Sequence, residues 1–357
     1  MVLALLNDEQ QMLREMMSSL AGSVSAGNPR DIGEIDRAKG WGALAGAGML
    51  GLRVRDGSGA PTGSGVDAMI VAEALGGALA PLPYVGSAVL ATELLALAGA
   101  PPDLLQRAAD GTERHTVLLI PDLSGIATVA GLGTAIAFDC WGAGHALALS
   151  DGGPAPRLVR VPLGDAADRG PAADLTREIA RFTAAPAAAD AEEIGRPLEP
   201  ADLSRWRALA LTVIAADAVG AMRAALDGVV AYSKERVAYG TLIGSFQAIQ
   251  HMCADALVHC EAASACVSYA AWAADEADPD EALLAAHTAK AYTAIASLDV
   301  AETVMQVYGG IGHTWEHVAH LYARRVLLDR EVLGDAAHSL LSVADLRLGQ
   351  RPRPEEG

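Results

Sequence analysis

The second half of the chain repeats apolar residues three or four positions apart. Trp206, Leu209 and Val213 begin this pattern, and Val219, Met222, Leu226 and Val229 continue it. This spacing places the apolar side chains on one face of a helix. Similar stretches cover roughly 245–278, 280–307 and 317–347, so the pattern predicts a four-helix bundle over 201–350, followed by a polar tail at 351–357.

The middle of the chain has a different pattern of short apolar runs bounded by Gly, Pro and Asp. Such runs are typical of β-strands. We expect a small, short β domain over 113–200 with antiparallel strands. The runs are TVLLI (116–120), TAIAFDCW (134–141), HALALS (145–150), RLVRVPL (157–163) and IARFTA (179–184).

The first 112 residues have helical signals again. Asp8 is a candidate cap for a first helix, an alanine-rich stretch surrounds Trp41, and an apolar run over 66–97 is interrupted at Pro81 and Pro83. The predicted fold class is therefore mainly α with a small β domain: an N-terminal helical domain (1–112), the β domain, and the C-terminal bundle.

Charge narrows the classes of partner. The 357 residues include 26 basic and 44 acidic side chains, a net charge of -18. An acidic surface repels phosphate backbones and anionic lipid, so we expect neither nucleic acid nor a membrane as partner. The four cysteines are scattered and are expected to be reduced. We find no secretory signal and no spanning helix, and expect a cytoplasmic protein.

Two short motifs have a structural and a functional interpretation. Residues 46–51 (GAGMLG) match a dinucleotide-binding loop, but a helix precedes them where a strand is required, which favours a helix end. Residues 313–317 (HTWEH) match a zinc-hydrolase spacing. That geometry needs His313 inside a helix, whereas the glycines at 309, 310 and 312 indicate a loop, so no metal is predicted.

Glu316 also has two interpretations as a single carboxylate. It follows a glycine-rich break between two long apolar helices. In an apolar pocket, desolvation raises the basicity of a carboxylate, which suits it to remove a weakly acidic C–H proton. The alternative is an exposed glutamate near a helix start, and composition alone favours this alternative.

Several runs together resemble the acyl-CoA dehydrogenase family, and the resemblance covers nearly the whole chain. The runs are WGALAGAGMLGLRVRDGSG, VAEALGGALAPLPYVGSAVLA, SKERVAYGTLIGSFQAIQHMCADA and ETVMQVYGGIGHTWEHVAHLYARR. The resemblance implies a helical domain, a middle β domain and a four-helix bundle, assembled as a dimer of dimers. It also implies bound FAD, with a glutamate removing the α proton of an acyl-CoA thioester while the β hydrogen leaves as hydride to flavin N5.

The resemblance assigns roles to individual residues. Glu316 resembles the family's catalytic base; the other place where members carry it, 207–213, has no carboxylate. Arg236 resembles the arginine that contacts the FAD pyrophosphate across a subunit interface, a role suited to a planar cation. The remaining matches concern the adenosine half of a neighbour's FAD: Gln306 and Gly310 resemble the residues that receive it, and Phe246 and Ile249 the wall beside it.

The sequence departs from the family where the flavin ring is held. The T-E-P-x-x-G-S and W-I-[ST] segments are missing, and PDLSG (121–125) is a weak counterpart of the first. The E-G-T segment is replaced by VLGDAAH (332–338), and R-x-Q-F-G by RVAYG (236–240). A buried flavin edge needs hydrogen-bond partners.

The residues that would contact the FAD of a neighbouring subunit therefore match the family better than the residues that would hold this chain's own flavin ring. We expect a subunit of a heteromeric acyl-CoA dehydrogenase that works with a homologous subunit, an acyl-CoA substrate and an electron-transfer flavoprotein or similar acceptor. Such heteromers are known among actinobacterial enzymes of steroid breakdown. The alternative is a non-catalytic scaffold subunit that completes the FAD site of its partner; a zinc hydrolase is a third, less favoured possibility.

Overall fold

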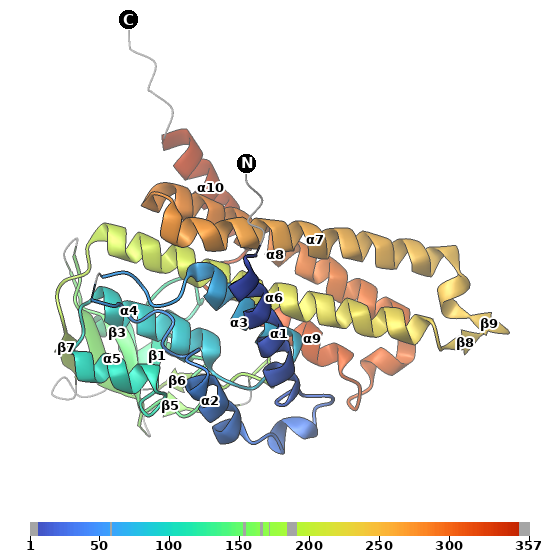
Figure 1. Ribbon diagram of the computed structural model, residues 1–357, viewed down its shortest axis with the longest axis horizontal. Helices are drawn as coiled ribbons and strands as arrows, with labels where there is room; N and C mark the ends of the chain where they lie inside the picture. Colours follow the sequence, from blue (N-terminus) through green and yellow to red (C-terminus); the bar gives the residue numbers. More distant parts are fainter. Residues whose placement is uncertain are drawn as a thin grey trace, which may run out of the picture.

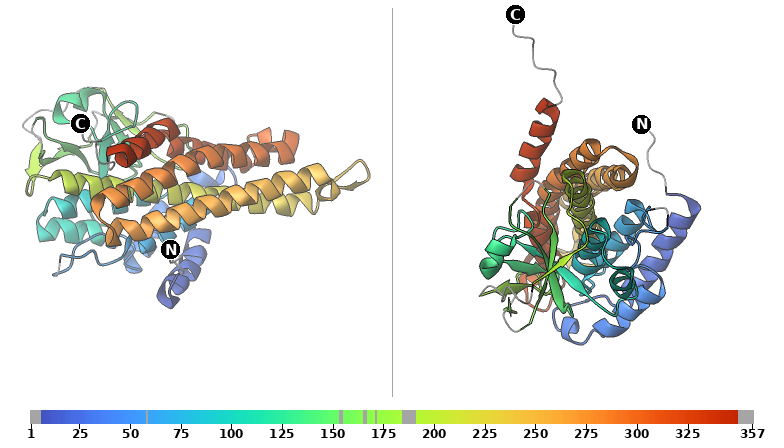
Figure 2. Two further views of the ribbon diagram at one scale, coloured as in Figure 1. Left: turned by 90° about the horizontal axis from the view of Figure 1, so that it is seen from above. Right: turned by 90° about the vertical axis from the view of Figure 1, so that its left-hand side faces the viewer.

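The computed structural model describes residues 6–57, 59–152, 155–164, 167–170, 172–183 and 191–349. Helices dominate, and one small sheet lies beside one end of a long helical bundle (Figure 1). The predicted fold class is confirmed. Figure 2 shows that the bundle helices run side by side and extend well beyond the sheet.

The N-terminal helices surround an apolar core. Asn7, not the predicted Asp8, caps the first helix: its side chain accepts the N–H of Gln10 at 2.8 Å. Residues 46–51 form a helix end, as expected, because α2 stops at Gly46 and Gly48 has φ +76°. The elements are α1 (Asp8–Gly22), η1 (Asp31–Gly33), α2 (Arg37–Gly46), α3 (Gly65–Gly77), η2 (Tyr84–Ala91), α4 (Thr92–Leu97) and α5 (Pro102–Ala109).

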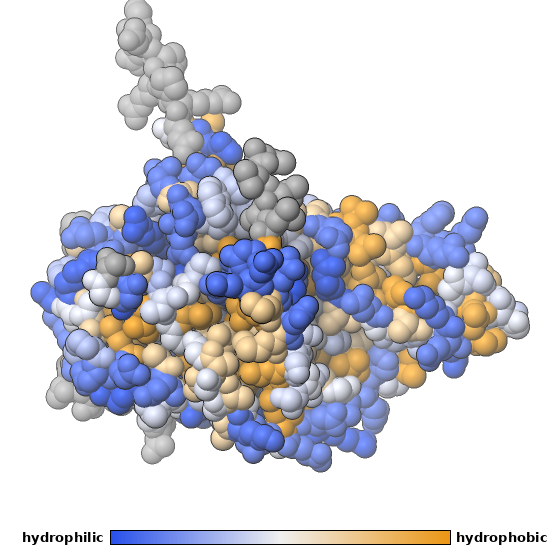
Figure 3. Space-filling model, viewed as in Figure 1, coloured by the Kyte–Doolittle hydropathy of each residue, from blue (hydrophilic) through white to orange (hydrophobic). Residues whose placement is uncertain are grey.

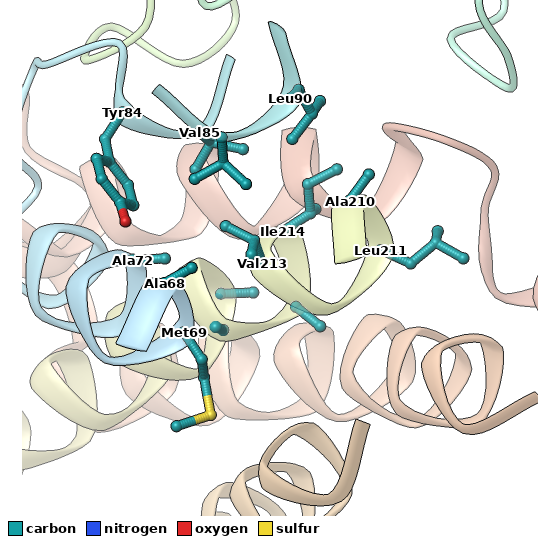
Figure 4. Packing of buried hydrophobic residues seen from close by; sticks show 14 of the residues in the cluster. Ala68, Met69, Ala72, Tyr84, Val85, Leu90, Ala210, Leu211, Val213 and Ile214 are labelled. Atoms are coloured by element: carbon teal, nitrogen blue, oxygen red, sulfur yellow. The ribbon is translucent and has the colours of Figure 1, made fainter. Parts of the chain in front are cut away.

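The break predicted at Pro81 and Pro83 separates α3 from η2, which is π-helical. Helix η2 lies against both α3 and the first bundle helix (Figure 4). Met69, Val85 and Val213 come from these three elements and are almost fully buried in one cluster. Burial of this kind contributes roughly 1.5–3 kcal/mol for each large aliphatic side chain, so this contact joins the N-terminal helices firmly to the bundle.

The middle of the chain forms a seven-stranded sheet of order β5-β6-β2-β1-β3-β4-β7. It is not wholly antiparallel as predicted, because β1 and β3 are parallel, with His115 opposite His145. The chain crosses from β2 over β1 to β3, and two reversals of direction leave β3 parallel to β1. The strands are β1 (His115–Leu119), β2 (Ile136–Phe138), β3 (His145–Leu149), β4 (Leu158–Pro162), β5 (Ala167–Asp168), β6 (Ala180–Phe182) and β7 (Glu192–Ile194), with η3 (Val129–Thr134) before β2.

The C-terminal half packs as a bundle of four helices. The helix predicted over 317–347 is two helices, because Leu333 and Gly334 have φ +60° and +98° and turn the chain between them. The bundle helices are α6 (Pro200–Ser233), α7 (Gln247–Glu276), α8 (Pro279–Tyr308) and α9 (Ala319–Glu331), and α10 (Ala336–Gly349) packs outside on α8.

Helix α6 is the centre of the molecule. It is long and apolar enough to cross a bilayer, but 89% of its most apolar window is buried inside the fold. It also touches α3 backbone to backbone. A Cβ on Gly76 would collide with the carbonyl of Asp217, and one on Gly220 with the carbonyl of Glu73. Only glycine permits this approach.

Candidate functional site at the two ends of the bundle

The residues singled out in the sequence fall at two ends of the bundle (Figure 1). We call residues 236–249 and 306–316 the far end, which lies away from the sheet. We call residues 121–125, Arg207 and residues 332–334 the sheet end, where the bundle meets the β domain. All five residues matched to FAD contacts belong to the far end.

Arg236 lies just beyond the last turn of α6, and its side chain is exposed. Its N–H donates to Tyr232 O at 2.9 Å, and its carbonyl accepts the N–H of Ile243 at 2.8 Å. Between these contacts, β8 (Val237–Ala238) and β9 (Thr241–Leu242) form a hairpin with Tyr239 and Gly240 at φ +53° and +80°. The backbone at Arg236 is thus fixed, while its guanidinium faces outward.

Phe246 and Ile249 lie at the start of α7, just after the hairpin and the 3₁₀ turn η5 (Ile243–Ser245). Phe246 is 38% exposed, and Ile249 lines an open cavity of about 500 Å³. The cavity is mainly apolar, with Val230, Leu242 and Cys253 on its walls. Figure 3 shows apolar patches on the bundle beyond the sheet. The exposed large apolar side chains at the far end are Val237, Tyr239, Leu242, Phe246, Ile311 and Trp315.

Gln306 and Gly310 border the link between α8 and α9, and both are exposed. Gly309 has φ +63°, and the 3₁₀ turn η6 (Gly309–His313) follows. Tyr308 fixes this link against α6, because its ring lies 5.0 Å from that of Tyr232. A Cβ on Gly310 would meet nothing within 4 Å, so the surface there is open to a ligand or another chain.

Glu316 is on the surface of the single chain. Its side chain is 62% exposed, and its carboxylate lies 3.4 Å from the guanidinium of Arg30. Trp315 beside it stacks on His320 at 5.3 Å between ring centroids. The apolar pocket expected for a base is absent around this described residue, because most of its side chain faces the solvent.

The zinc-hydrolase spacing does not form a metal site. His313 ends η6, and residues 314–318 are not helical, so His313 and His317 are not one helical turn apart on one face. His317 Nδ1 instead accepts the N–H of Ala319 at 3.1 Å, at the start of α9. The glycines at 309, 310 and 312 had indicated the non-helical link that the structure has here.

At the sheet end, residues 121–125 are the weak counterpart of the family's flavin-holding segment. They are hydrogen-bonded to other parts of this chain. The carbonyl of Leu123 accepts the N–H of Leu333 at 2.8 Å. Arg207 donates from Nη2 to the carbonyls of Ser124 at 3.3 Å and Leu333 at 3.1 Å. The N–H groups of Leu123 and Ser124 donate to Ile120 O and Asp122 Oδ1. These backbone groups are therefore occupied within the chain.

A buried ionic network lies beside this closure and joins all three parts of the chain. Arg325 of α9 donates to Asp217 of α6 at 2.7 Å, to Thr176 at 2.7 Å and to the carbonyl of Ala80 at 3.2 Å. Arg177 pairs with Asp217 at 2.8 Å and with Asp329 at 3.0 Å. All of these side chains are fully buried, so removing one partner leaves an uncompensated charge.

The acids of this network have different pKa values. Burial raises the pKa of Asp217, but Arg325 and Arg177 outweigh it and hold that pKa below its usual range. Burial raises the pKa of Asp329 well above its usual value, and this carboxyl hydrogen-bonds to Asp217. Asp329 therefore holds a proton more readily than Asp217 does.

A cavity of about 580 Å³ lies behind Arg207, between α8 and α10. His287 borders it and is almost fully buried. Burial, together with the positive charges of Arg207, His338 and Lys290, lowers the pKa of His287 to about 4. The imidazole is therefore neutral at pH 7.

Reasoning from sequence missed Arg207 and the contact between Leu123 and Leu333. Residues 207–213 were of interest only because they contain no carboxylate, and Arg207 is the first of them. An arginine among apolar helical positions is a signal in itself, because a buried guanidinium needs carbonyl or carboxylate partners. The pairing of Leu123 with Leu333 has no comparable signal, because both are apolar and contribute only backbone atoms.

Comparison with known proteins shows the family. Residues 7–102 match the N-terminal domain of acyl-CoA dehydrogenases, and residues 210–345 match the C-terminal domain. Acyl-CoA dehydrogenase IpdE2 of Mycobacterium tuberculosis is 31% identical over 89% of this chain and 91% of its own. FadE34 of the same organism is 47% identical over 117 residues. These residues make up 33% of this chain and 16% of FadE34.

Solved structures agree. The Tcur3481-Tcur3483 steroid ACAD variant has a TM-score of 0.81 at 26% identity, covering 96% of this chain and 98% of that chain. The ChsE4-ChsE5 complex of Mycobacterium tuberculosis has a TM-score of 0.78 at 23% identity, covering 98% and 99%. The chain belongs to the acyl-CoA dehydrogenase family, whose cofactor is FAD.

The two ends differ in how well they fit FAD. At the far end, an exposed guanidinium, an open glycine and an apolar wall suit a phosphate-linked adenosine. At the sheet end, the N–H and carbonyl groups of Leu123 and Ser124 are already bonded within the chain and are not free to meet a flavin ring. The far end therefore fits the cofactor better than this part of the sheet end.

Proposed function

We propose that this chain is one subunit of a heteromeric, FAD-dependent acyl-CoA dehydrogenase, and that it completes the FAD site of a homologous partner. The observation that carries the proposal is the contrast between the exposed residues of the far end and the internally bonded segment 121–125. FAD, when bound, supplies the hydride acceptor. The partner's β domain holds its ring.

The residues of the far end have distinct roles in this proposal. Arg236 faces the pyrophosphate, since a guanidinium can give two parallel hydrogen bonds to phosphate oxygens. Gln306 and Gly310 receive the adenosine, where the glycine allows close backbone approach. Phe246 and Ile249 form the apolar wall beside it.

We propose a bulky acyl-CoA thioester, derived from a steroid, as the substrate of the complex. The support is the similarity to the steroid ACAD Tcur3481-Tcur3483, whose two designations match an assembly of two different chains. A dimer of dimers with an electron-transfer flavoprotein as acceptor completes the proposal. Of the two alternatives drawn from the sequence, the closed sheet end supports the accessory role for this chain.

The test is co-expression with the homologous acyl-CoA dehydrogenase chains encoded next to it, followed by measurement of FAD per chain. We expect one FAD per pair of unlike chains and none on this chain alone. Arg236→Ala should weaken FAD retention about 10- to 100-fold, the loss of a charged hydrogen bond. Arg205→Ala is the matched control, since Arg205 is exposed on the opposite end of α6.

Two results would contradict the proposal. One is a yellow protein with one FAD per chain when this chain is expressed alone. The other is equal FAD retention in the Arg236→Ala and Arg205→Ala complexes.

A second candidate makes Glu316 the catalytic base. What favours it is the position of Glu316 at the far end, which the proposed partner would cover and desolvate. In the accessory role, Glu316→Gln should leave turnover of the complex unchanged. A loss of about 10² or more in kcat, the usual contribution of a general base, would assign the base to this chain.

A further inference from the structure

Three potential metal ligands meet where the neighbouring central strands β1 and β3 begin. Glu113 lies in the link between α5 and β1, and His115 and His145 open the parallel strands β1 and β3. The two histidines are direct partners in the register of these strands. Their rings stack with centroids 5.8 Å apart, so the strand pairing itself brings the imidazoles together.

The distances suit a tetrahedral cation. His115 Nε2 lies 3.2 Å from Glu113 Oε1, and His145 Nδ1 lies 3.5 Å from the same oxygen. One ligand atom from each residue falls within 4.8 Å of the others. Two ligands about 2.1 Å from a zinc ion at the tetrahedral angle are about 3.4 Å apart. The carboxylate oxygen is thus at ligand spacing from both imidazole nitrogens.

The histidine nitrogens lack other partners. His115 is almost fully buried, and neither of its ring nitrogens has a hydrogen-bond partner among the described residues. His145 Nδ1 is also buried and unpartnered there. An orphaned buried nitrogen of this kind points to a ligand.

The charges around the cluster leave room for a cation. Arg107 binds Glu113 Oε2 at 2.7 Å and leaves Oε1 facing the histidines. Arg160 lies 3.4 Å from Oε1 and also pairs with Glu192 at 3.3 Å, while Asp103 pairs with Arg107 at 2.7 Å. Three carboxylates against two guanidinium groups give a local charge of -1. Arg107 does not reach the ligand atoms, but its hydrogen bond to Glu113 Oε2 orients this carboxylate.

We propose that Glu113, His115 and His145 bind one divalent cation of the zinc class, with Glu113 Oε1, His115 Nε2 and His145 Nδ1 as ligands. Mixed imidazole and carboxylate ligands favour zinc over magnesium or calcium. The cation joins the first residues of β1 and β3 to the preceding link, and its fourth position faces the solvent beside the partly exposed His145. The site is independent of the far end and of the proposed function.

The test uses the full chain, freed of metal with a chelator. Zinc is then titrated by calorimetry, and cobalt is added as a spectroscopic probe of tetrahedral coordination. We expect one zinc per chain, a visible cobalt absorption, and an increase in Tm with zinc, because a ligand that binds only the folded state stabilises it. His145→Gln and Glu113→Gln should each weaken zinc binding by about 10-fold or more.

A matched control is His313→Gln with His317→Gln, which removes two histidines from the link between α8 and α9 and should leave zinc binding unchanged. The proposal is overturned if the metal-free chain takes up no zinc, or if His145→Gln and Glu113→Gln bind it as tightly as the parent. His145 is partly exposed, so its variant tests the site even if changes at buried His115 prevent folding.

Discussion

The two ends of the bundle are built in opposite ways. At the sheet end, Arg207 donates to the carbonyls of Ser124 and Leu333, and the N–H of Leu333 donates to Leu123 O. A buried network around Arg325 joins three parts of the chain. At the far end, Arg236 is exposed and Tyr239 is 99% exposed at the tip of a two-residue turn. The same helix, α6, begins at one end and finishes at the other.

The difference indicates where each end finds its partners. A buried polar group must be satisfied inside the fold, and at the sheet end the chain satisfies itself. Exposed arginine and aromatic side chains at the far end have no such constraint, and these residue types dominate protein interfaces. The contrast predicts that substitutions at the sheet end reduce the stability of the isolated chain, whereas those at the far end affect assembly.

The largest effect is expected for Arg325→Ala. Removing one partner of a buried ion network typically costs about 3–5 kcal/mol, because Asp217 is left charged and buried. We expect a loss of this size in the free energy of unfolding, measured by urea titration. Arg324→Ala is the control, since Arg324 is only partly buried and lies next in the chain. Equal effects of the two substitutions would break the comparison.

A smaller, pH-dependent effect is expected for His287→Gln. The pKa of His287 is about 4 in the folded chain and 6.5 unfolded, so the unfolded state binds the extra proton. Stability therefore falls as the pH is lowered from about 6.5 to 4, by up to about 3 kcal/mol for this group. His287→Gln should flatten that fall in pH-dependent urea titrations.

The closure itself is tested by Arg207→Ala. The carbonyls of Ser124 and Leu333 lose their charged donor, which should cost about 1–3 kcal/mol of unfolding free energy. Arg205→Ala, two residues earlier and exposed, should change it by less than about 0.5 kcal/mol. If the two variants unfold at the same urea concentration, the contacts of Arg207 do not hold the sheet end closed.

The smallest effect on stability is expected for Tyr239→Ala, within about 0.5 kcal/mol, because the side chain is almost fully exposed. In the complex with its proposed partner the same change should weaken association by about 2 kcal/mol or more, as for a central aromatic contact. Affinity measured by calorimetry against the Met12→Ala variant checks this, since Met12 is an exposed apolar residue on α1. Equal affinities would contradict the assignment of the far end as an interface.

Much of the fold could be predicted from the sequence. The apolar spacing of Trp206, Leu209 and Val213 identifies the buried face of α6 because a regular helix repeats its environment every turn. The runs at 116–120 and 145–150 identify β1 and β3 because fully buried strands are continuously apolar. The resemblance to the family rests on longer runs of residues. It is the basis for the prediction that Arg236 and Gln306 contact FAD.

The rest depends on contacts that no local pattern encodes. Leu333 has a left-handed conformation, which leucine rarely adopts, so the sequence gives little warning that the predicted helix 317–347 is divided. The exposure of Glu316 depends on what lies opposite it in space. His115 and His145 are each visible as the first residue of a strand, but their pairing requires knowing that β1 and β3 are parallel neighbours.

The backbone contact between α3 and α6 has a consequence for how the enzyme family can adapt here. Gly76 and Gly220 leave no space between these two helices, so the helices cannot slide apart or exchange side chains for larger ones. A side chain larger than glycine at either position would have to push the N-terminal helices away from the bundle. The size of two residues thus sets the distance at which these two parts of the chain can meet.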